Sequence, residues 1–377
     1  MPKLVIISNG HGEDHIGAQL AKAVQEGFPN WEILPFPLVG KGQAYARHQL
    51  TPLIQNPSFP SGGFIRGLGV LIQDLKAGLL THIWRQKKQL KTLISQADHV
   101  LCVGDIFALW MGSTPQTKAK TTFLPTAKSD KFLPHSSIEK GLMRRSCAHI
   151  FTRDALTAEN LQTDGLPAQF LGNPMMDGLN PVGEHFPFST PDPVIGILPG
   201  SRDEALANLD LIFQILDTYP TPLNLVIAKS PSLTLGPHQS RHAVHITENF
   251  ADVIAQADLI IGLAGTANEQ AVYWKKTVIS FPGTGPQTTP QRLQEQAQLL
   301  DHRINFLNTQ DPTRITGQIA ALLTGKSKTP APPMSHPPAA RLIIQELLRK
   351  YKNPKTCDVR EMSKGPISRL TWFGSSK

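Results

Sequence analysis

The chain uses one pattern twice: short runs of aliphatic and β-branched residues alternate with longer amphipathic stretches. The short runs are 4–7, 100–103, 194–198, 223–227 and 259–261, and helical spacing covers 16–24 and 205–218. Strands that alternate with helices are typical of parallel sheets. The pattern therefore predicts an α/β chain with two Rossmann-like, doubly wound domains, and a length of 377 residues suits two cores of ordinary size.

The proline- and glycine-rich segment 173–193 separates the two patterns and is typical of an interdomain connection. A second Pro-rich link near 325–338 leads to helical spacing, followed by a polar, basic tail. The expected units are a first domain over 1–172, a linker over 173–193, a second domain over 194–330, a C-terminal helix over 339–352 that packs back on the first domain, and a flexible tail over 353–377.

The formal net charge of +8 favours anionic partners, namely nucleic acid, an anionic membrane surface or phosphorylated substrates. No zinc finger, aromatic RNA-binding strand or long basic arm accompanies the charge, so nucleic acid is not an expected partner. The three cysteines are widely spaced and suit neither a disulfide framework nor a zinc site. With no signal peptide or membrane-spanning run in the sequence, we expect a cytoplasmic protein.

A candidate phosphate site follows the run 194–198. Gly200, Ser201 and Arg202 lie between this predicted strand and a predicted helix start. Free backbone N–H groups at a helix N-terminus, a hydroxyl and a guanidinium together suit a diphosphate. A turn that merely reverses the chain would not need the arginine.

A second small-residue turn follows the run 259–261. Gly265 and Thr266 are expected to meet the same phosphates, with Asn268 on the same nucleotide-binding helix. Glu269 or Gln270, in the first helical turn, is the candidate partner of the ribose hydroxyls, although helix-end stabilisation alone also explains Glu269.

The loop 281–290 comes after the next predicted strand and is expected to line the same cleft, with Gln287 as its most useful polar group. Its prolines and glycines could equally serve chain geometry alone.

The first lobe opens with a predicted strand and a loop that contains Asn9, Gly10, His11, Gly12 and Asp14, before a helix expected near residue 16. The third glycine of a dinucleotide fingerprint is missing, which argues against NAD. His11 is a candidate base because imidazole titrates near neutral pH, or it could only orient a sugar. For Asp14, a helix N-cap is an equal alternative to a site role.

Asp105 follows the strand-like run 100–103 and Gly104, so it should lie at the carboxyl end of a strand. It is the second candidate base, with a helix cap as the alternative. The stretch 61–93 mixes aliphatic and aromatic residues with six Lys or Arg residues, which suits either an interfacial helix or a core helix with a solvated basic face.

Taken together, the motifs resemble the lipid-A-disaccharide synthase family of GT-B glycosyltransferases, especially the related proteins of cyanobacteria. The resemblance covers about residues 3 to 350 and rests on motif order. Its segments are the loop 9–14, Val103-Gly-Asp105, Leu171-Gly-Asn-Pro-Met-Met-Asp177, Leu198-Pro-Gly-Ser-Arg202 and Gly265-Thr-Ala-Asn-Glu-Gln270.

The resemblance implies a GT-B fold and transfer of a hexose from a UDP-sugar to a hydroxyl of a lipid-like acceptor at the cytoplasmic membrane face, with no cofactor and no metal. By the same likeness Ser201 and Arg202 contact the diphosphate, Thr266 and Glu269 or Gln270 the nucleotide, and Asp105 is the base. The first loop departs from the family's Gly-Glu-x-Ser-Gly-Asp pattern. The alternatives are a UDP-sugar 2-epimerase and a non-catalytic, membrane-associated protein that binds a nucleotide.

Overall fold

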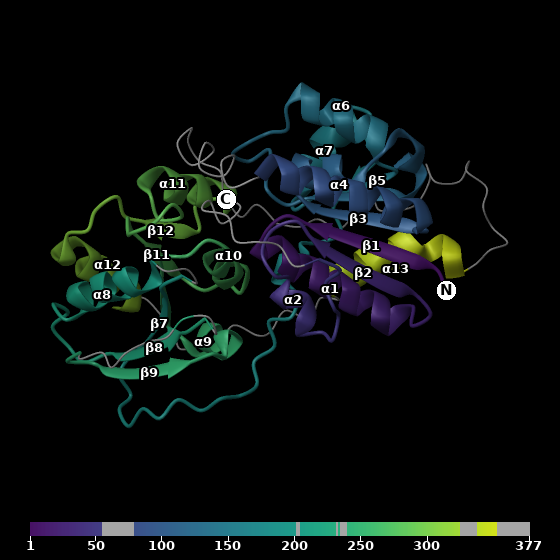
Figure 1. Cartoon of the computed structure of the whole chain (residues 1–377). Helices are drawn as coiled ribbons and strands as arrows, with labels where there is room; N and C mark the ends of the chain where they lie inside the picture. The colour runs from purple at the N-terminus through teal and green to yellow at the C-terminus, as the bar shows by residue number, and fades with distance from the viewer. Residues whose placement is uncertain (55–78, 201–203, 231–232, 234–239, 325–337, 353–377) are drawn as a thin grey trace.

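The computed structural model describes residues 1–54, 79–200, 204–230, 233, 240–324 and 338–352. Ser201, Arg202, most of the basic stretch 61–93 and the tail 353–377 thus fall wholly or largely outside the described residues. Figure 1 shows two α/β lobes side by side, joined by an extended segment along one edge.

The first lobe is built on a sheet of order β2-β1-β3-β4-β5-β6, and every neighbouring pair is parallel. Its strands are β1 (Lys3–Ser8), β2 (Glu32–Pro37), β3 (His99–Gly104), β4 (Thr121–Pro125), β5 (His149–Phe151) and β6 (Ala168–Gln169). Its helices are α1 (His11–Gly27), α2 (Gln43–Ala46), α4 (Leu79–Gln96), α5 (Ile106–Gly112), η1 (Pro115–Lys120), α6 (Ser137–Ser146), α7 (Ala155–Thr163) and η2 (Pro174–Met176). The strand order reverses between β1 and β3.

The second lobe has the order β12-β11-β10-β7-β8-β9, again parallel throughout. Its strands are β7 (Val194–Leu198), β8 (Asn224–Ala228), β9 (Ala243–Thr247), β10 (Leu259–Gly262), β11 (Val278–Ser280) and β12 (Ile304–Phe306). Its helices are α8 (Ala205–Leu216), α9 (Phe250–Gln256), α10 (Thr266–Tyr273), α11 (Pro290–Leu299) and α12 (Pro312–Thr324). In such a sheet, ligands bind beyond the strand ends where the order reverses, here between β7 and β10.

Each sheet is covered on both faces. Along β1, Leu4 and Ile6 pack with α1, whereas Val5 and Ile7 pack with α4 and α5 on the opposite face. All four side chains are fully buried, which explains why the strand reads as an unbroken apolar run. The doubly wound, two-domain α/β fold expected from the sequence is confirmed.

Helix α1 begins at His11, not near residue 16 as expected. Gly10 is its N-cap residue, and the acidic residues Glu13 and Asp14 occupy the first turn, where the helix dipole favours negative charge. The expectation that Asp14 is the N-cap is therefore wrong. The sequence does not reveal this start because the first turn is polar and lacks the apolar periodicity of the later turns.

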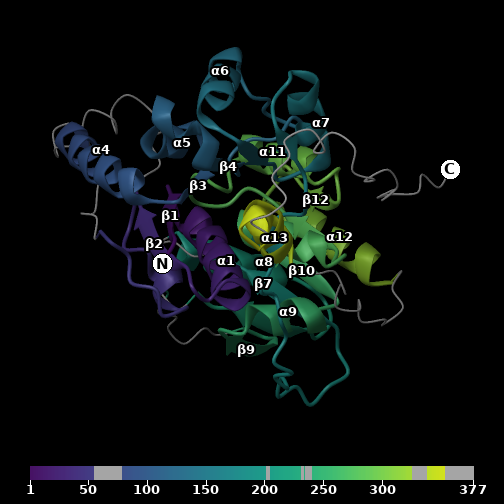
Figure 2. The same cartoon turned by 90° about the vertical axis from the view of Figure 1, so that its right-hand side faces the viewer.

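The last described helix, α13 (Ala339–Lys352), returns to the first lobe and lies beside α1, as Figure 2 also shows. Ala340, Ile343, Ile344, Leu347 and Leu348 join the α1 side of the first-lobe core. The Asp177 carboxylate accepts hydrogen bonds from the backbone N–H groups of Ala339 (2.9 Å) and Ala340 (2.7 Å) at the start of this helix. No helix in the described ranges is long and apolar enough to cross a membrane.

Candidate functional site

Three loops of the second lobe converge at the switch point between β7 and β10. Gly200, two residues after β7, has a φ of +106°, and a Cβ built there would lie 3.4 Å from the Leu263 carbonyl oxygen. A glycine thus lets the β7 turn approach the β10 turn with the backbone that this position requires. Ser201 and Arg202, which follow, remain sequence-based candidates because they lie outside the described residues.

Asn208 on α8 fastens two of these loops together. Its amide nitrogen donates to the carbonyl oxygens of Pro199 (3.3 Å) and Thr284 (3.2 Å), and its amide oxygen accepts from the Thr284 N–H (2.7 Å). The side chain is buried, so these bonds are protected from water. Asn208 therefore positions the loop that carries Gln287 against the loop that carries Gly200.

The N-terminus of α10 is open towards this switch point. Its N-cap residue is Gly265, which supplies no side-chain cap, and Thr266, the first helical residue, is exposed. A Cβ on Gly265 would lie 3.8 Å from the Gln287 Oε1, which puts the 281–290 loop beside the same helix start. Uncapped N–H groups with a neighbouring hydroxyl and amide suit an anion.

Two of the nucleotide candidates on α10 already have protein partners. Asn268 is fully buried, and its amide nitrogen donates to the Gly262 carbonyl and to Gln296 Oε1, both at 3.1 Å. Gln270 donates to the Met175 carbonyl oxygen in η2 at 2.6 Å. These contacts fix α10 to β10 and to the linker, so neither amide group points freely at a ligand.

In the first lobe, Asn9 and Asp105 meet across the switch point between β1 and β3. The Asn9 amide donates to Asp105 Oδ1 at 2.6 Å, and the same oxygen accepts from the backbone N–H groups of Phe107 (2.8 Å) and Ala108 (3.3 Å). Asp105 is thus the N-cap of α5, which was the alternative to its role as base. Gly104 (φ +137°) is needed beside it, because a Cβ there would lie 1.8 Å from Asn9 Oδ1.

Burial raises the pKa of Asp105, and the backbone hydrogen bonds of Ala108 and Phe107 oppose that shift. Burial also raises the pKa of Glu13, in the first turn of α1. The neighbouring Asp105 adds to the Glu13 shift, while Thr126 and Arg153 reduce it. Two acidic groups of raised pKa therefore lie together at the carboxyl ends of the first-lobe strands.

Asp14 points away from this pair into the lobe. Only 1% of its surface is exposed, its Oδ1 accepts from the Ser8 hydroxyl at 2.6 Å, and the Ser8 and Tyr45 hydroxyls are 2.8 Å apart. Burial raises the Asp14 pKa to about 7, helped by the charge of Glu13 and opposed by the Ser8 hydrogen bond. The side chain is a buried structural acid, so a direct role of Asp14 in the acceptor loop finds no support in its position.

Of the remaining loop candidates, Gly10 is the N-cap of α1, while His11 and Gly12 are its first two residues. A Cβ on Gly12 would meet no atom within 4 Å. The backbone of His11 is described but its side chain is not, so His11 stays a sequence-based candidate base.

An ion pair joins the two sets of strand ends. Arg153, two residues after β5, donates to Glu269 Oε2 on α10 at 2.6 Å and to the Thr126 carbonyl at 2.9 Å. Both side chains are nearly buried, at 9% and 11% exposure. A more exposed pair, Lys131 with Asp301 at 2.8 Å, bridges the lobes nearby. We call these contacts, with Gln270–Met175, the lobe junction.

Sequence analysis missed Glu13, Arg153, Thr126 and Asn208. Three of these residues could have been found from their place after a strand: Thr126 directly follows β4, Arg153 follows β5 by two residues, and Glu13 is in the helical turn after β1. Polar residues at the carboxyl ends of parallel strands are candidates for a ligand site even without a glycine-rich motif. Asn208 lies inside a helix, where no local pattern marks it.

A hollow of about 390 Å³ lies elsewhere, between Leu171 and the α13 residues Leu342, Gln345, Glu346 and Arg349. None of the site candidates lines it. The candidate site lies instead where the strand ends of the two lobes converge near the Arg153–Glu269 pair. Within the described part of the chain, no three His, Cys, Asp or Glu residues are grouped so as to hold a metal ion.

No family model matches the sequence, and no curated protein does either. Among solved structures, the MurG protein of Acinetobacter baumannii has a TM-score of 0.55 at 14% identity, covering 93% of this chain and 100% of that one. The UDP-N-acetylglucosamine 2-epimerase of Neisseria meningitidis, solved with UDP-N-acetylglucosamine bound, has a TM-score of 0.55 at 16% identity, covering 93% and 100%. The calicheamicin glycosyltransferase CalG4 has a TM-score of 0.56 at 12% identity, covering 93% and 94%. These likenesses establish a GT-B fold.

Proposed function

We propose that this GT-B chain is a glycosyltransferase that moves a hexose from a UDP-sugar to a hydroxyl of a lipid-like acceptor without a metal ion. The observation that carries the proposal is the Arg153–Glu269 contact, because it brings the open start of α10 to the acidic group of Glu13 and Asp105. This contact supports a phosphate site on the second lobe that faces candidate bases on the first. Glycosyl transfer needs that arrangement, since donor and acceptor must meet.

On the donor side, the uncapped N–H groups of α10, the Thr266 hydroxyl and the Arg202 guanidinium would hold the diphosphate. As the sugar leaves, negative charge develops on the UDP, and fixed dipoles and a guanidinium stabilise that charge. This supports a reaction in which the protein's own groups perform the task that a metal performs elsewhere.

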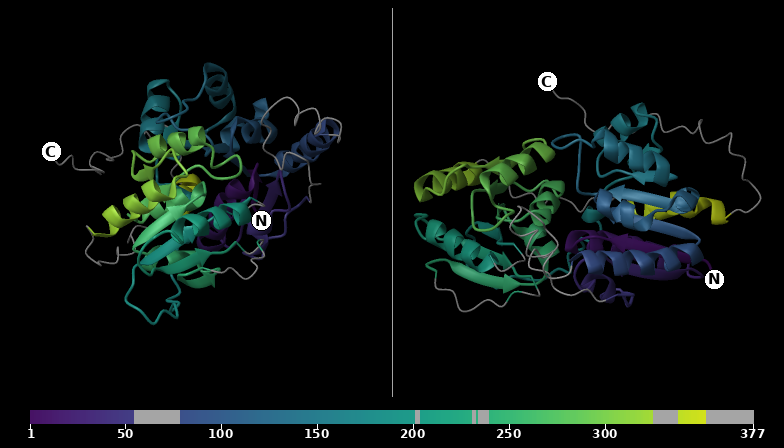
Figure 3. Two further views of the ribbon diagram at one scale, coloured as in Figure 1. Left: turned by 90° about the vertical axis from the view of Figure 1, so that its left-hand side faces the viewer. Right: turned by 45° about the horizontal axis from the view of Figure 1, so that its top comes forward.

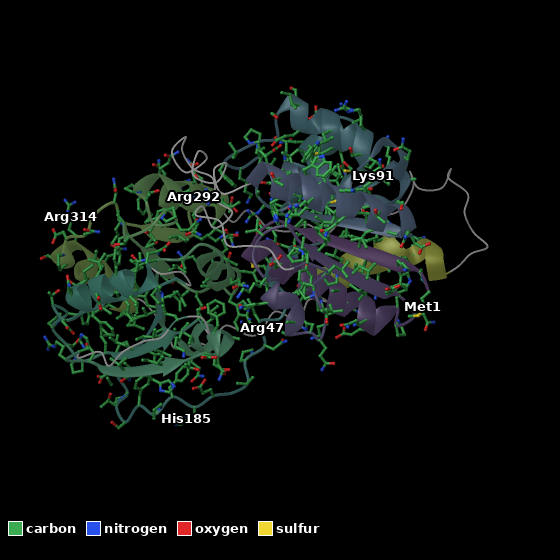
Figure 4. All side chains as sticks on the ribbon, viewed as in Figure 1. Met1, Arg47, Lys91, His185, Arg292 and Arg314 are labelled. Atoms are coloured by element: carbon green, nitrogen blue, oxygen red, sulfur yellow. The ribbon has the colours of Figure 1, made fainter. Side chains whose placement is uncertain are left out.

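A surface on α4 and α5 supports the lipid-like acceptor and a peripheral membrane location. Leu80, Trp84 and Trp110 are 67%, 66% and 46% exposed, and the ammonium of Lys88 lies 5.8 Å from the Trp84 ring centroid. Arg85, Lys88 and Lys91 are exposed on α4, and Figure 4 places Lys91 on the first lobe, away from the second. Aromatic and basic side chains together suit an anionic membrane interface.

The buried side of α4 fits the alternative, a core helix with a solvated basic face, because Leu90 and Ile94 pack into the first-lobe core. The two interpretations are compatible: one helix face holds the lobe together while the other meets lipid. Within glycosyltransferases, the motif order described above supports a relation to the lipid-A-disaccharide synthase family.

A UDP-sugar 2-epimerase is the second candidate, favoured by the likeness to the Neisseria meningitidis epimerase. The test is incubation of the protein with UDP-N-acetylglucosamine, first alone and then with vesicles that contain diacylglycerol as a hydroxyl-bearing lipid. Mass spectrometry and NMR identify the products. UDP with a glycosylated lipid, or UDP with a free sugar of unchanged configuration at C2, supports the transferase. A sugar or UDP-sugar epimerised at C2 without acceptor supports the epimerase instead, and no turnover of UDP-N-acetylglucosamine contradicts both.

A further inference from the structure

Glu13 and Asp105 are the two acidic residues beside the lobe junction, and they differ in what holds them. The neighbours of Glu13 are its own backbone N–H and the Thr126 hydroxyl, whereas Asp105 Oδ1 accepts three hydrogen bonds that make Asp105 the N-cap of α5. Glu13 is partly exposed, so a substrate hydroxyl can reach it. A general base must accept one more proton in the transition state. The hydrogen bonds of Ala108, Phe107 and Asn9 stabilise the charged form of Asp105, which makes that carboxylate a weaker proton acceptor.

The surroundings of Glu13 come from four elements. Asp105 follows β3, Thr126 follows β4, Arg153 follows β5, and Gly10 precedes α1. The Thr126 hydroxyl lies beside the Glu13 carboxyl and favours its charged form. That hydroxyl is buried, with 7% of the residue exposed, and makes no well-aligned hydrogen bond to any described residue. A buried hydroxyl next to a partly exposed carboxylate suits a ligand hydroxyl that hydrogen-bonds to both.

Gly10 determines where the Glu13 carboxylate lies. A Cβ at residue 10 would lie 2.4 Å from Glu13 Oε2, so the carboxylate folds over the glycine. Any larger residue would push the flexible end of Glu13 aside while leaving the helix intact. The absence of a side chain at Gly10 therefore allows the carboxylate to lie close to the end of β1, at the first-lobe switch point.

We propose that Glu13 is the catalytic base of the transferase, with Thr126 orienting the acceptor hydroxyl. The inference rests on the proposed function. The acceptor O–H bond breaks and its proton goes to the Glu13 carboxylate, while the acceptor oxygen forms a bond to the anomeric carbon. The bond from that carbon to the diphosphate breaks, and its electron pair leaves with UDP. Solvent later removes the proton from Glu13, so no oxidant or reductant is needed.

The acid–base chemistry agrees with this role. Burial and the Asp105 charge raise the pKa of Glu13, while its own backbone N–H, Thr126 and Arg153 limit the shift. A carboxylate of raised pKa is a better proton acceptor at neutral pH than an ordinary surface glutamate.

The experiment measures release of UDP from UDP-N-acetylglucosamine, UDP-glucose and UDP-galactose by the full chain. UDP release counts transfer to any hydroxyl, including water. Glu13→Gln is expected to reduce the rate by about 10²–10⁴-fold while UDP affinity measured by calorimetry stays unchanged. Glu13→Ala is expected to regain part of the rate with added formate, which replaces the missing carboxylate. A purely structural glutamate would show no such rescue.

Gly10→Ala is the matched positional variant, because it moves the carboxylate without removing it. We expect it to slow UDP release, whereas Gly27→Ala, where an added Cβ meets no atom within 4 Å, keeps the wild-type rate. Wild-type rates in Glu13→Gln, or a greater loss in Asp105→Asn than in Glu13→Gln, would overturn the assignment of the base alone. A wild-type chain that releases no UDP would overturn the proposed function with it.

Discussion

At the scale of single residues, Asp14 couples folding to pH. Burial disfavours the charged form and raises the pKa of Asp14 from its ordinary 3.8 to about 7 in the fold. Between these values the folded chain holds a proton that the unfolded chain releases. The free energy of unfolding should therefore fall as pH rises from about 4 to 7, by up to about 4 kcal/mol from this group.

The corresponding test is urea unfolding of the wild type and of Asp14→Asn at pH 5 and pH 8. The amide can still accept the Ser8 hydrogen bond but cannot ionise, so the variant should lose this part of the pH dependence and be more stable than the wild type at pH 8. Glu159→Gln, at an exposed position on α7, is the control and should keep the wild-type pH dependence. Equal pH dependence in Asp14→Asn and the wild type would disprove the linkage.

The residues that the sequence marks as candidates and those it does not mark differ in how far their partners lie along the chain. A turn after an apolar strand marks Gly200, Gly265 and Asp105 locally, and all three stay candidates for the site. Arg153 contacts a residue 116 positions away, and Asn9 contacts Asp105 96 positions away. No local sequence pattern near Arg153 predicts its pairing with Glu269, because that pairing depends on how the two lobes face each other. The sequence therefore predicts strand ends well and cross-lobe partners poorly.

At the scale of elements, strands were predicted closely and helix starts less so. The expected run 194–198 coincides with β7, and 259–261 differs from β10 by one residue. Buried parallel strands are continuous apolar runs, which local sequence reveals. The sequence does not predict the start of α1 because its first turn is polar. The apolar periodicity that indicates a helix begins only one turn later.

Helix α13 offers an element-scale prediction. Asp177 accepts the N–H groups of Ala339 and Ala340, so Asp177→Ala should remove the N-terminal cap and cost about 1–2 kcal/mol of helix stability. Amide hydrogen exchange should accelerate in 341–349 and much less in β1. Asp177→Asn retains one acceptor and should lie between the two proteins. Unchanged exchange in α13 of Asp177→Ala would mean that apolar packing on α1 alone holds the helix.

At the scale of the whole molecule, the Arg153–Glu269 pair holds the lobes in the arrangement that Figure 3 shows from two further sides. Arg153→Ala leaves a nearly buried carboxylate without its partner, which favours separation of the lobes. We expect a larger radius of gyration in X-ray scattering than for the wild type. Lys131→Ala removes the more exposed junction pair and should change the scattering less, since such pairs contribute about 0–1 kcal/mol. Superimposable scattering curves for Arg153→Ala and the wild type would contradict this role.

We propose that the second lobe binds a nucleotide diphosphate at the β7–β10 switch point, and isothermal titration of the chain with UDP is the decisive test. We expect saturable binding of UDP, no binding of NAD, and a loss of about 10- to 100-fold in UDP affinity in Arg202→Ala, equivalent to about 1.4–2.7 kcal/mol. Absence of UDP binding, or the same UDP affinity in Arg202→Ala and the wild type, would contradict it.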